Sequence, residues 1–191
     1  MGTKFATVYN CFLGKITDDM YLELTPEDTI RDLQNLLINA IPGFEFPRIN
    51  LYDYTLKTEN MLENQVENGD FIIGIVWETI PNNSDIPQVI VEQSTFNCEL
   101  TPEEINILAI LMQANWLQRQ ITSIENTRMK FSGADFKFTS QANHLSKLLS
   151  LSNEVNRQSH HMQRLYKRRK ISNNGTYASN WSIFGSNNVL D

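Results

Sequence analysis

The sequence predicts an α+β fold in which a small β-sheet domain is followed by a long α-helical hairpin and an extended C-terminal arm. Two observations predict it. Residues 1–80 hold short runs of β-branched and aromatic residues around one amphipathic helical segment. Residues 101–170 instead repeat apolar residues at helical spacing over two long stretches. The chain has 191 residues, 41% of them hydrophobic, which is enough for a packed core.

Four strands and one helix are expected within residues 1–80. The helix is predicted to begin at the N-cap Thr29 and to end at Pro42-Gly43. Its apolar face is formed by Ile30, Leu33, Leu37 and Ile41. The strands are rich in β-branched, aromatic or aliphatic residues and are expected over residues 4–13, 16–24, 49–52 and 71–77.

This ββαβ order, with the run PEDTI at Pro26–Ile30, resembles the ubiquitin-like β-grasp family over about 75 residues. The resemblance implies a compact scaffold that binds other proteins and is not an enzyme. Where ubiquitin ends in a free Gly-Gly, this chain continues through residues 78–81, so conjugation is not expected. Asn50 stands at the position of the isoleucine that centres ubiquitin's binding patch, so ordinary ubiquitin receptors are expected to bind poorly.

Composition divides the chain into four segments. We expect a β-grasp domain over 1–80, a linker with a short strand over 81–100, an antiparallel helical hairpin over 101–170 and an extended arm over 171–191. The first hairpin helix begins with the capping sequence Thr101–Glu104, and the second begins at Thr139 or Ser140. The short strand, around Val89–Val91, is expected to join a sheet edge or to pair between subunits.

Large side chains in the C-terminal half are candidates for protein contacts. One lies on the first hairpin helix and four lie in the polar arm: Trp116, Tyr177, Trp181, Ile183 and Phe184. The runs WLQRQI (116–121), SQANHL (140–145) and YKRRK (166–170) resemble small virion proteins of tailed bacteriophages. That resemblance implies an oligomeric structural or assembly protein of the head, portal vertex or tail, made in the host cytoplasm and located in the virion. The alternative is a cytoplasmic ubiquitin-like adaptor that binds a protein partner.

Charge is unevenly distributed, which predicts two distinct surfaces. Residues 1–80 carry five basic and 13 acidic side chains, whereas residues 102–191 carry 11 basic and six acidic ones. Six of the basic residues follow one another without an acid between them: Arg157, Arg164, Lys167, Arg168, Arg169 and Lys170. Four interpretations are open. The residues stabilise the end of a helix, pair with an acidic protein surface, contact a nucleic-acid backbone, or form a nuclear import signal.

The sequence offers no recognisable catalytic chemistry. It has no glycine-rich phosphate loop, no nucleophile elbow and no Cys/His grouping of the zinc type. Its two cysteines, Cys11 and Cys98, are far apart, and the histidines His144, His160 and His161 are expected to be solvated helix residues. We therefore assign no catalytic residue, cofactor or metal and expect a non-enzyme. No apolar run is long enough to predict a membrane span.

Overall fold

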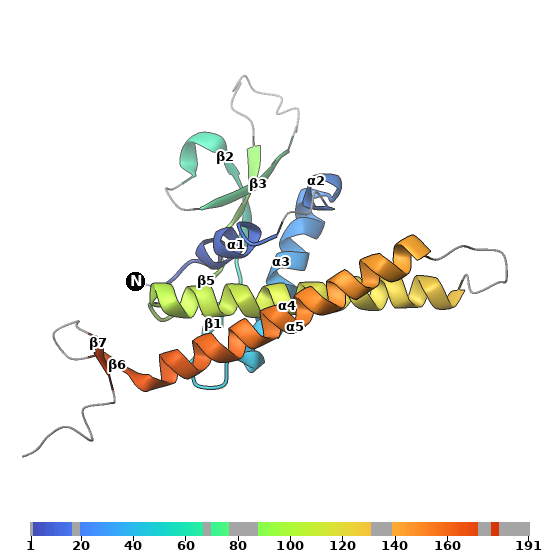
Figure 1. The fold of residues 1–191 in the computed structure, drawn as a ribbon. Helices are drawn as coiled ribbons and strands as arrows, with labels where there is room; N and C mark the ends of the chain where they lie inside the picture. Colours follow the sequence, from blue (N-terminus) through green and yellow to red (C-terminus); the bar gives the residue numbers. More distant parts are fainter. Residues whose placement is uncertain are drawn as a thin grey trace, which may run out of the picture.

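The computed structural model describes residues 2–16, 20–66, 70–76, 88–130, 139–171 and 177–179. Within these ranges the α+β class is confirmed, since helices are combined with small antiparallel sheets. The α-helices are α1 (Phe5–Leu13), α2 (Met20–Glu23), α3 (Pro26–Ala40), α4 (Pro102–Lys130) and α5 (Thr139–Arg168). Figure 1 shows α4 and α5 lying antiparallel, with α1, α3 and the largest sheet stacked on one side of them.

The largest sheet has three antiparallel strands in the order β2-β4-β3. They are β2 (Thr58–Leu62), β3 (Phe71–Val76) and β4 (Gln88–Glu92). The strands predicted near residues 71–77 and 89–91 are thereby confirmed. The expected edge position of the second one is wrong, because β4 lies between the other two and Val89 to Glu92 are buried.

Two smaller sheets are two-stranded. In the first, β1 (Tyr54–Thr55) pairs with β5 (Thr95–Phe96). In the second, β6 (Arg169–Ile171) pairs with β7 (Tyr177–Ser179) directly after α5. Two short 3-10 helices, η1 (Ile41–Gly43) and η2 (Glu63–Gln65), follow α3 and β2.

The strand predicted over residues 4–13 is wrong, because this segment is helix α1. Its buried residues Phe5, Val8, Tyr9 and Phe12 recur at intervals of three, one and three, which places them on one helical face. That face packs against α4 and the side chain of Phe96. Burial of a helical stripe therefore outweighs the β-propensity of the individual residues.

The strand predicted over residues 16–24 is also wrong, since the described part of it contains helix α2. The N-cap of the next helix, α3, lies four residues before the predicted cap Thr29. Thr25 is its N-cap: Thr25 Oγ1 accepts a hydrogen bond from the Asp28 amide at 3.2 Å, and Pro26 is the first helical residue. With helices where two strands were expected, the ββαβ order of residues 1–80 is not observed in the described part of the chain.

A turn replaces the strand predicted over residues 49–52. Asn50 Oδ1 accepts a hydrogen bond from the amide of Tyr52 at 3.1 Å, and the Asn50 carbonyl accepts one from the amide of Asp53 at 3.4 Å. An asparagine that bonds to the backbone two residues ahead stabilises a turn instead of a strand. Leu51 is nevertheless buried, because the turn presses it into the core.

One hydrophobic core joins the N-terminal helices to the two long helices. Its buried members include Phe5, Phe12, Leu33, Leu37, Ile107 and Tyr166. They come from α1, α3, α4 and the last turn of α5, so segments 1–80 and 101–170 share this core. A smaller cluster of Ile110, Leu117 and Val155 continues it between α4 and α5. Full burial of each such side chain stabilises the fold by about 1.5–3 kcal/mol.

The start of α4 has the capping box that the sequence predicts. Thr101 Oγ1 accepts a hydrogen bond from the Glu104 amide at 3.3 Å, and the Glu104 carboxylate accepts one from the Thr101 amide at 2.8 Å. The other carboxylate oxygen of Glu104 accepts a hydrogen bond from the Tyr166 hydroxyl of α5. The cap of one long helix is thus bonded to the last turn of the other.

We predict that Thr101→Ala lowers the free energy of unfolding by about 1 kcal/mol, because it removes the side-chain acceptor of the capping box. Urea denaturation monitored by circular dichroism measures the change. Thr122→Ala is the matched control: Thr122 is exposed within the same helix and donates only to the Gln118 carbonyl. An equal loss in both variants would show that the cap has no special role.

Candidate functional site

The structure places part of the predicted basic segment on one face of α5. Arg157, Arg164 and Arg168 are separated by seven and four residues, so they project from the same side of the helix. All three are exposed, and the positions that face α4, such as Ser152 and Val155, lie on the opposite side. We call these three residues the basic stripe; it is roughly 16 Å long at 1.5 Å per residue.

The other basic residues of the segment are held differently. Lys167 Nζ lies 3.9 Å from the centre of the Phe46 ring, and Arg169 Nη1 lies 3.0 Å from Glu103 Oε1. Lys170 belongs to β6, and its side chain lies outside the described part of the structure. The structure therefore does not gather the six predicted residues into one patch.

The end of α5 is fixed by the loop that follows η1. The Arg48 guanidinium stacks 4.2 Å from the centre of the Tyr166 ring and donates hydrogen bonds to the carbonyls of Tyr166 and Arg169. Gln163 Oε1 accepts a hydrogen bond from the Glu45 amide at 2.7 Å. A cation at the carbonyl end of a helix is electrostatically favourable. The basic stripe therefore lies on a helix whose C-terminal end is fixed by these contacts.

Of the predicted aromatic contacts, Trp116 lies half-buried between the core and the smaller α4–α5 cluster. Its buried indole nitrogen has no hydrogen-bond acceptor among the residues that the structure describes. Tyr177 lies in β7 opposite Ile171, but its side chain is not described. Trp181, Ile183 and Phe184 lie outside the described residues.

The far halves of α4 and α5 extend past the rest of the fold as a two-helix projection (Figure 1). Ile121 and Leu145 are buried within this projection. Leu149 and Leu151 remain 43% and 45% exposed. At 100° per residue, they lie on opposite sides of the α5 stripe that faces α4. The projection therefore presents leucines on both of its flanks.

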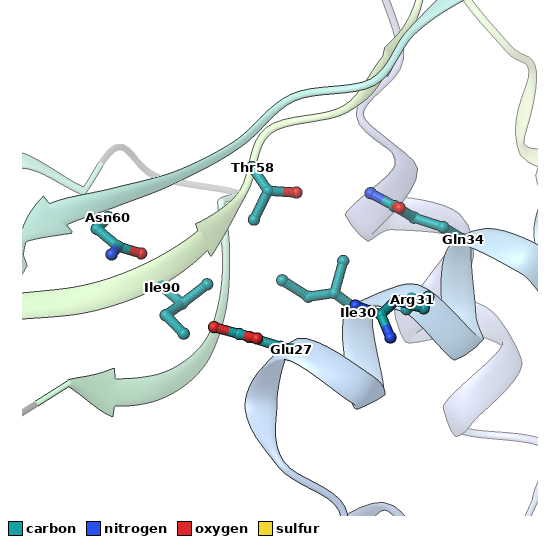
Figure 2. Close-up of a pocket in the computed structure, with 7 residues that line it drawn as sticks. All are labelled: Glu27, Ile30, Arg31, Gln34, Thr58, Asn60 and Ile90. Atoms are coloured by element: carbon teal, nitrogen blue, oxygen red, sulfur yellow. The ribbon is translucent and has the colours of Figure 1, made fainter.

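Sequence reasoning missed a cleft between α3 and the largest sheet. Helix α3 packs over β3 and β4 and leaves the inner face of β2 uncovered. The resulting cleft has a volume of about 300 Å³. Figure 2 shows the α3 side chains opposite those of the strands; the lining residues include Glu27, Ile30, Gln34, Thr58, Asn60 and Ile90.

A buried carboxylate lies deep beside this cleft. Glu92 is 1% exposed, and its two oxygens accept hydrogen bonds from Gln34 Nε2 at 2.9 Å and from the Ser94 amide at 2.9 Å. Burial, and after it the Glu92 charge, raise the pKa of Tyr9. A carboxylate with both oxygens occupied in this way holds α3 to the sheet and is poorly placed to accept a substrate proton.

A second cleft, of about 450 Å³, lies between α3 and α4. Its wall holds an ion pair between Asp32 and Arg119, and the Tyr21 hydroxyl donates to the same carboxylate at 2.8 Å. Burial opposes ionisation of Asp32, but the hydrogen bonds from Arg119 and Tyr21 outweigh it and lower its pKa. The same partners raise the pKa of Arg119 against the opposing effect of burial. The cleft therefore keeps both charges at neutral pH.

The described part of the chain shows neither a metal-binding cluster nor a membrane-spanning helix. Over the described ranges, no three His, Cys, Asp or Glu side chains are grouped so that they would hold a metal ion. In the same ranges no helix combines the length and apolarity required to cross a bilayer. No family model matches the chain, and searches of curated proteins and of solved structures found no significant match either.

We predict that acid weakens the fold partly through Asp32. Because the folded-state pKa of Asp32 is below its ordinary value of 3.8, its ionised form adds stability above about pH 4. That contribution is lost as the pH falls through the folded-state pKa. Urea denaturation between pH 7 and pH 2.5 should therefore show Asp32→Asn closing its stability gap to the unmodified protein at low pH.

The control for this measurement is Glu125→Gln, which changes an exposed carboxylate on α4. We expect its small effect on stability to stay nearly constant over the same pH range. A gap between Asp32→Asn and the unmodified protein that does not shrink in acid would contradict the assigned role of the ion pair.

Proposed function

We propose that this chain is a non-enzymatic assembly protein that holds other protein chains through the projecting halves of α4 and α5. The observation that carries the proposal is the pair of exposed leucines, Leu149 and Leu151, on the flanks of that projection. Two packed helices bury only the seam between them, so a further chain lying along either flank would complete the burial. Completing it would contribute about 1 kcal/mol for each leucine, since each is already half-buried.

The state of the charged groups supports binding over catalysis. The carboxylates of Glu92, Glu104 and Asp32 are buried or half-buried, and all accept hydrogen bonds from neighbouring groups. Each of these bonds joins one structural element to another or caps a helix. A catalytic acid or base needs an oxygen that a substrate can reach. We therefore assign these carboxylates to the scaffold.

For the biological setting we propose an oligomeric component of a tailed-phage virion, as the C-terminal sequence runs suggest. A cellular adaptor remains the alternative. The proposal does not depend on kinship with ubiquitin, because the first two strands of such a domain are helices in this chain. It depends on a surface that binds protein.

We predict that Leu149→Glu combined with Leu151→Glu releases the chain from the complex in which it is isolated from its native host. The bound fraction, measured by native mass spectrometry, should fall at least tenfold, because a charge cannot enter a dry interface unpaired. Ser150→Glu is the matched control, since Ser150 lies between the leucines in sequence but on the solvent face of α5. Release by the control as well, or by neither variant, would contradict the proposal.

A second candidate function is binding of a nucleic-acid backbone by the basic stripe. The specific observation in its favour is that Arg157, Arg164 and Arg168 share an exposed helical face. The competing observation is that Arg157 already lies 2.6 Å from Glu154. An exposed pair of this kind is weak and is easily exchanged for a phosphate.

For this second function we predict that affinity for duplex DNA falls steeply with salt. Arg164→Glu should weaken binding and reduce the slope of log affinity against log salt by about 1. Arg31→Glu makes the same change in net charge on α3 and should leave the slope unchanged. Fluorescence anisotropy measures both, and absence of binding in 50 mM salt would rule the function out.

A further inference from the structure

The outer edge of β2 is a second surface that the described part of the fold leaves available. Strand β2 pairs with β4 along one edge, and no described strand pairs with its other edge. An open edge presents backbone donors and acceptors in a row and is a template for another strand. In native proteins such an edge is either protected or used.

The register determines which backbone groups face outward. The amide of Gln93 donates to the Lys57 carbonyl at 2.9 Å, and the Lys57 amide donates to Ser94 Oγ at 2.9 Å, so the backbone groups of Lys57 point toward the β4 side. Because hydrogen-bonded pairs alternate along an antiparallel ladder, Glu59 and Met61 also point their backbone groups toward β4. The amides and carbonyls of Thr58, Asn60 and Leu62 therefore point toward the open edge.

The space beside this edge is clear of helix α3. Within this sheet, helix α3 packs mainly against β3 and β4, and Figure 2 shows Thr58 and Asn60 of β2 across the cleft from the α3 side chains. A strand added at the edge of β2 would extend the sheet away from α3. The uncovered inner face of β2 gives two such sheets room to meet without a collision between their α3 helices.

The charged residues on either side of Asn60 are complementary to those of a second copy of the strand that runs antiparallel to the first. Lys57 lies just before β2 and Glu63 just after it, as the first residue of η2; each is three residues from Asn60 and exposed. Lys57 Nζ lies 3.1 Å from Glu59 Oε2, but an exposed pair of this kind is weak and leaves Lys57 able to exchange partners. An antiparallel copy centred on Asn60 brings each Lys57 opposite the partner subunit's Glu63, in a position where cross-strand side chains are close. It also brings the two Asn60 residues together, and a primary amide both donates and accepts.

We propose that two copies of this chain pair antiparallel through the outer edges of β2, about a two-fold axis at Asn60, to form one continuous six-stranded sheet. Each copy donates from the amides of Thr58, Asn60 and Leu62 to the other. Opposite charges at equal distances from the centre favour a second copy, because a copy of the same strand carries both charges at the spacing that pairs both ends at once. This pairing is a contact between two copies of the proposed assembly protein, so the inference rests on that proposed function.

Sedimentation velocity of the full chain over about 1–500 μM tests the proposal. The unmodified protein should show a monomer–dimer equilibrium in this range, since a five-residue edge is a small interface. Lys57→Glu and Glu63→Lys, which place like charges opposite each other, should each raise the dimer Kd about tenfold. The double variant Lys57→Glu/Glu63→Lys restores opposite charges and should return the Kd close to its original value.

A backbone variant tests the hydrogen bonds separately from the charges. Asn60→Pro removes an amide that points away from β4, so circular dichroism should be unchanged while dimerisation is lost. A chain that stays monomeric at 500 μM, or a dimer that these single variants leave intact, would overturn the proposed pairing. Those outcomes leave the leucine-flanked projection untouched, because the native complex and the Leu149 and Leu151 variants report on it independently.

Discussion

The Glu104 carboxylate connects the start of one long helix to the end of the other. One of its oxygens closes the capping box at the start of α4, and the other accepts the Tyr166 hydroxyl at the end of α5. Glu104 is 3% exposed, and Tyr166 is covered by the ring of Phe44 and the guanidinium of Arg48. Burial, and after it the hydrogen bond to Glu104, raise the pKa of Tyr166 and so keep its hydroxyl proton in place as a donor. The position of α5, and with it the basic stripe and the projection, depends on this contact.

Local signals with one clear physical cause were the predictable part of the fold. Side chains close to one another in sequence determine the cap at Thr101, the helices α4 and α5, and the apolar strand β3. The same signal was present and missed at Thr25-Pro26-Glu27-Asp28, which has nearly the composition of the sequence at Thr101. Helix α1 was missed for another reason. Its residues have β-propensity, and only the face of α4 against which they pack determines that they form a helix.

The candidate sites also differ in whether a local sequence pattern predicts them. A common face for Arg157, Arg164 and Arg168 follows from helical spacing alone. The pairing of Arg169 with Glu103 joins residues 66 positions apart, so no local pattern announces it. The cleft beside β2 is also invisible in the sequence, because it results from how far α3 reaches across the sheet. Glu92 ends an apolar strand, and no local pattern predicts its hydrogen bond with Gln34 of the earlier helix α3.

The shared core has a consequence for the order in which the chain acquires structure. During synthesis from the N-terminus, Phe5 and Leu37 have no complete core until Ile107 emerges, and the core is closed only by Tyr166. Contacts that span so much of the sequence slow the search for the native state. Until the segment that ends α5 has left the ribosome, the apolar faces of α1 and α3 stay exposed to solvent and to other nascent chains. Nascent chains of this protein therefore need protection from aggregation until Tyr166 has emerged.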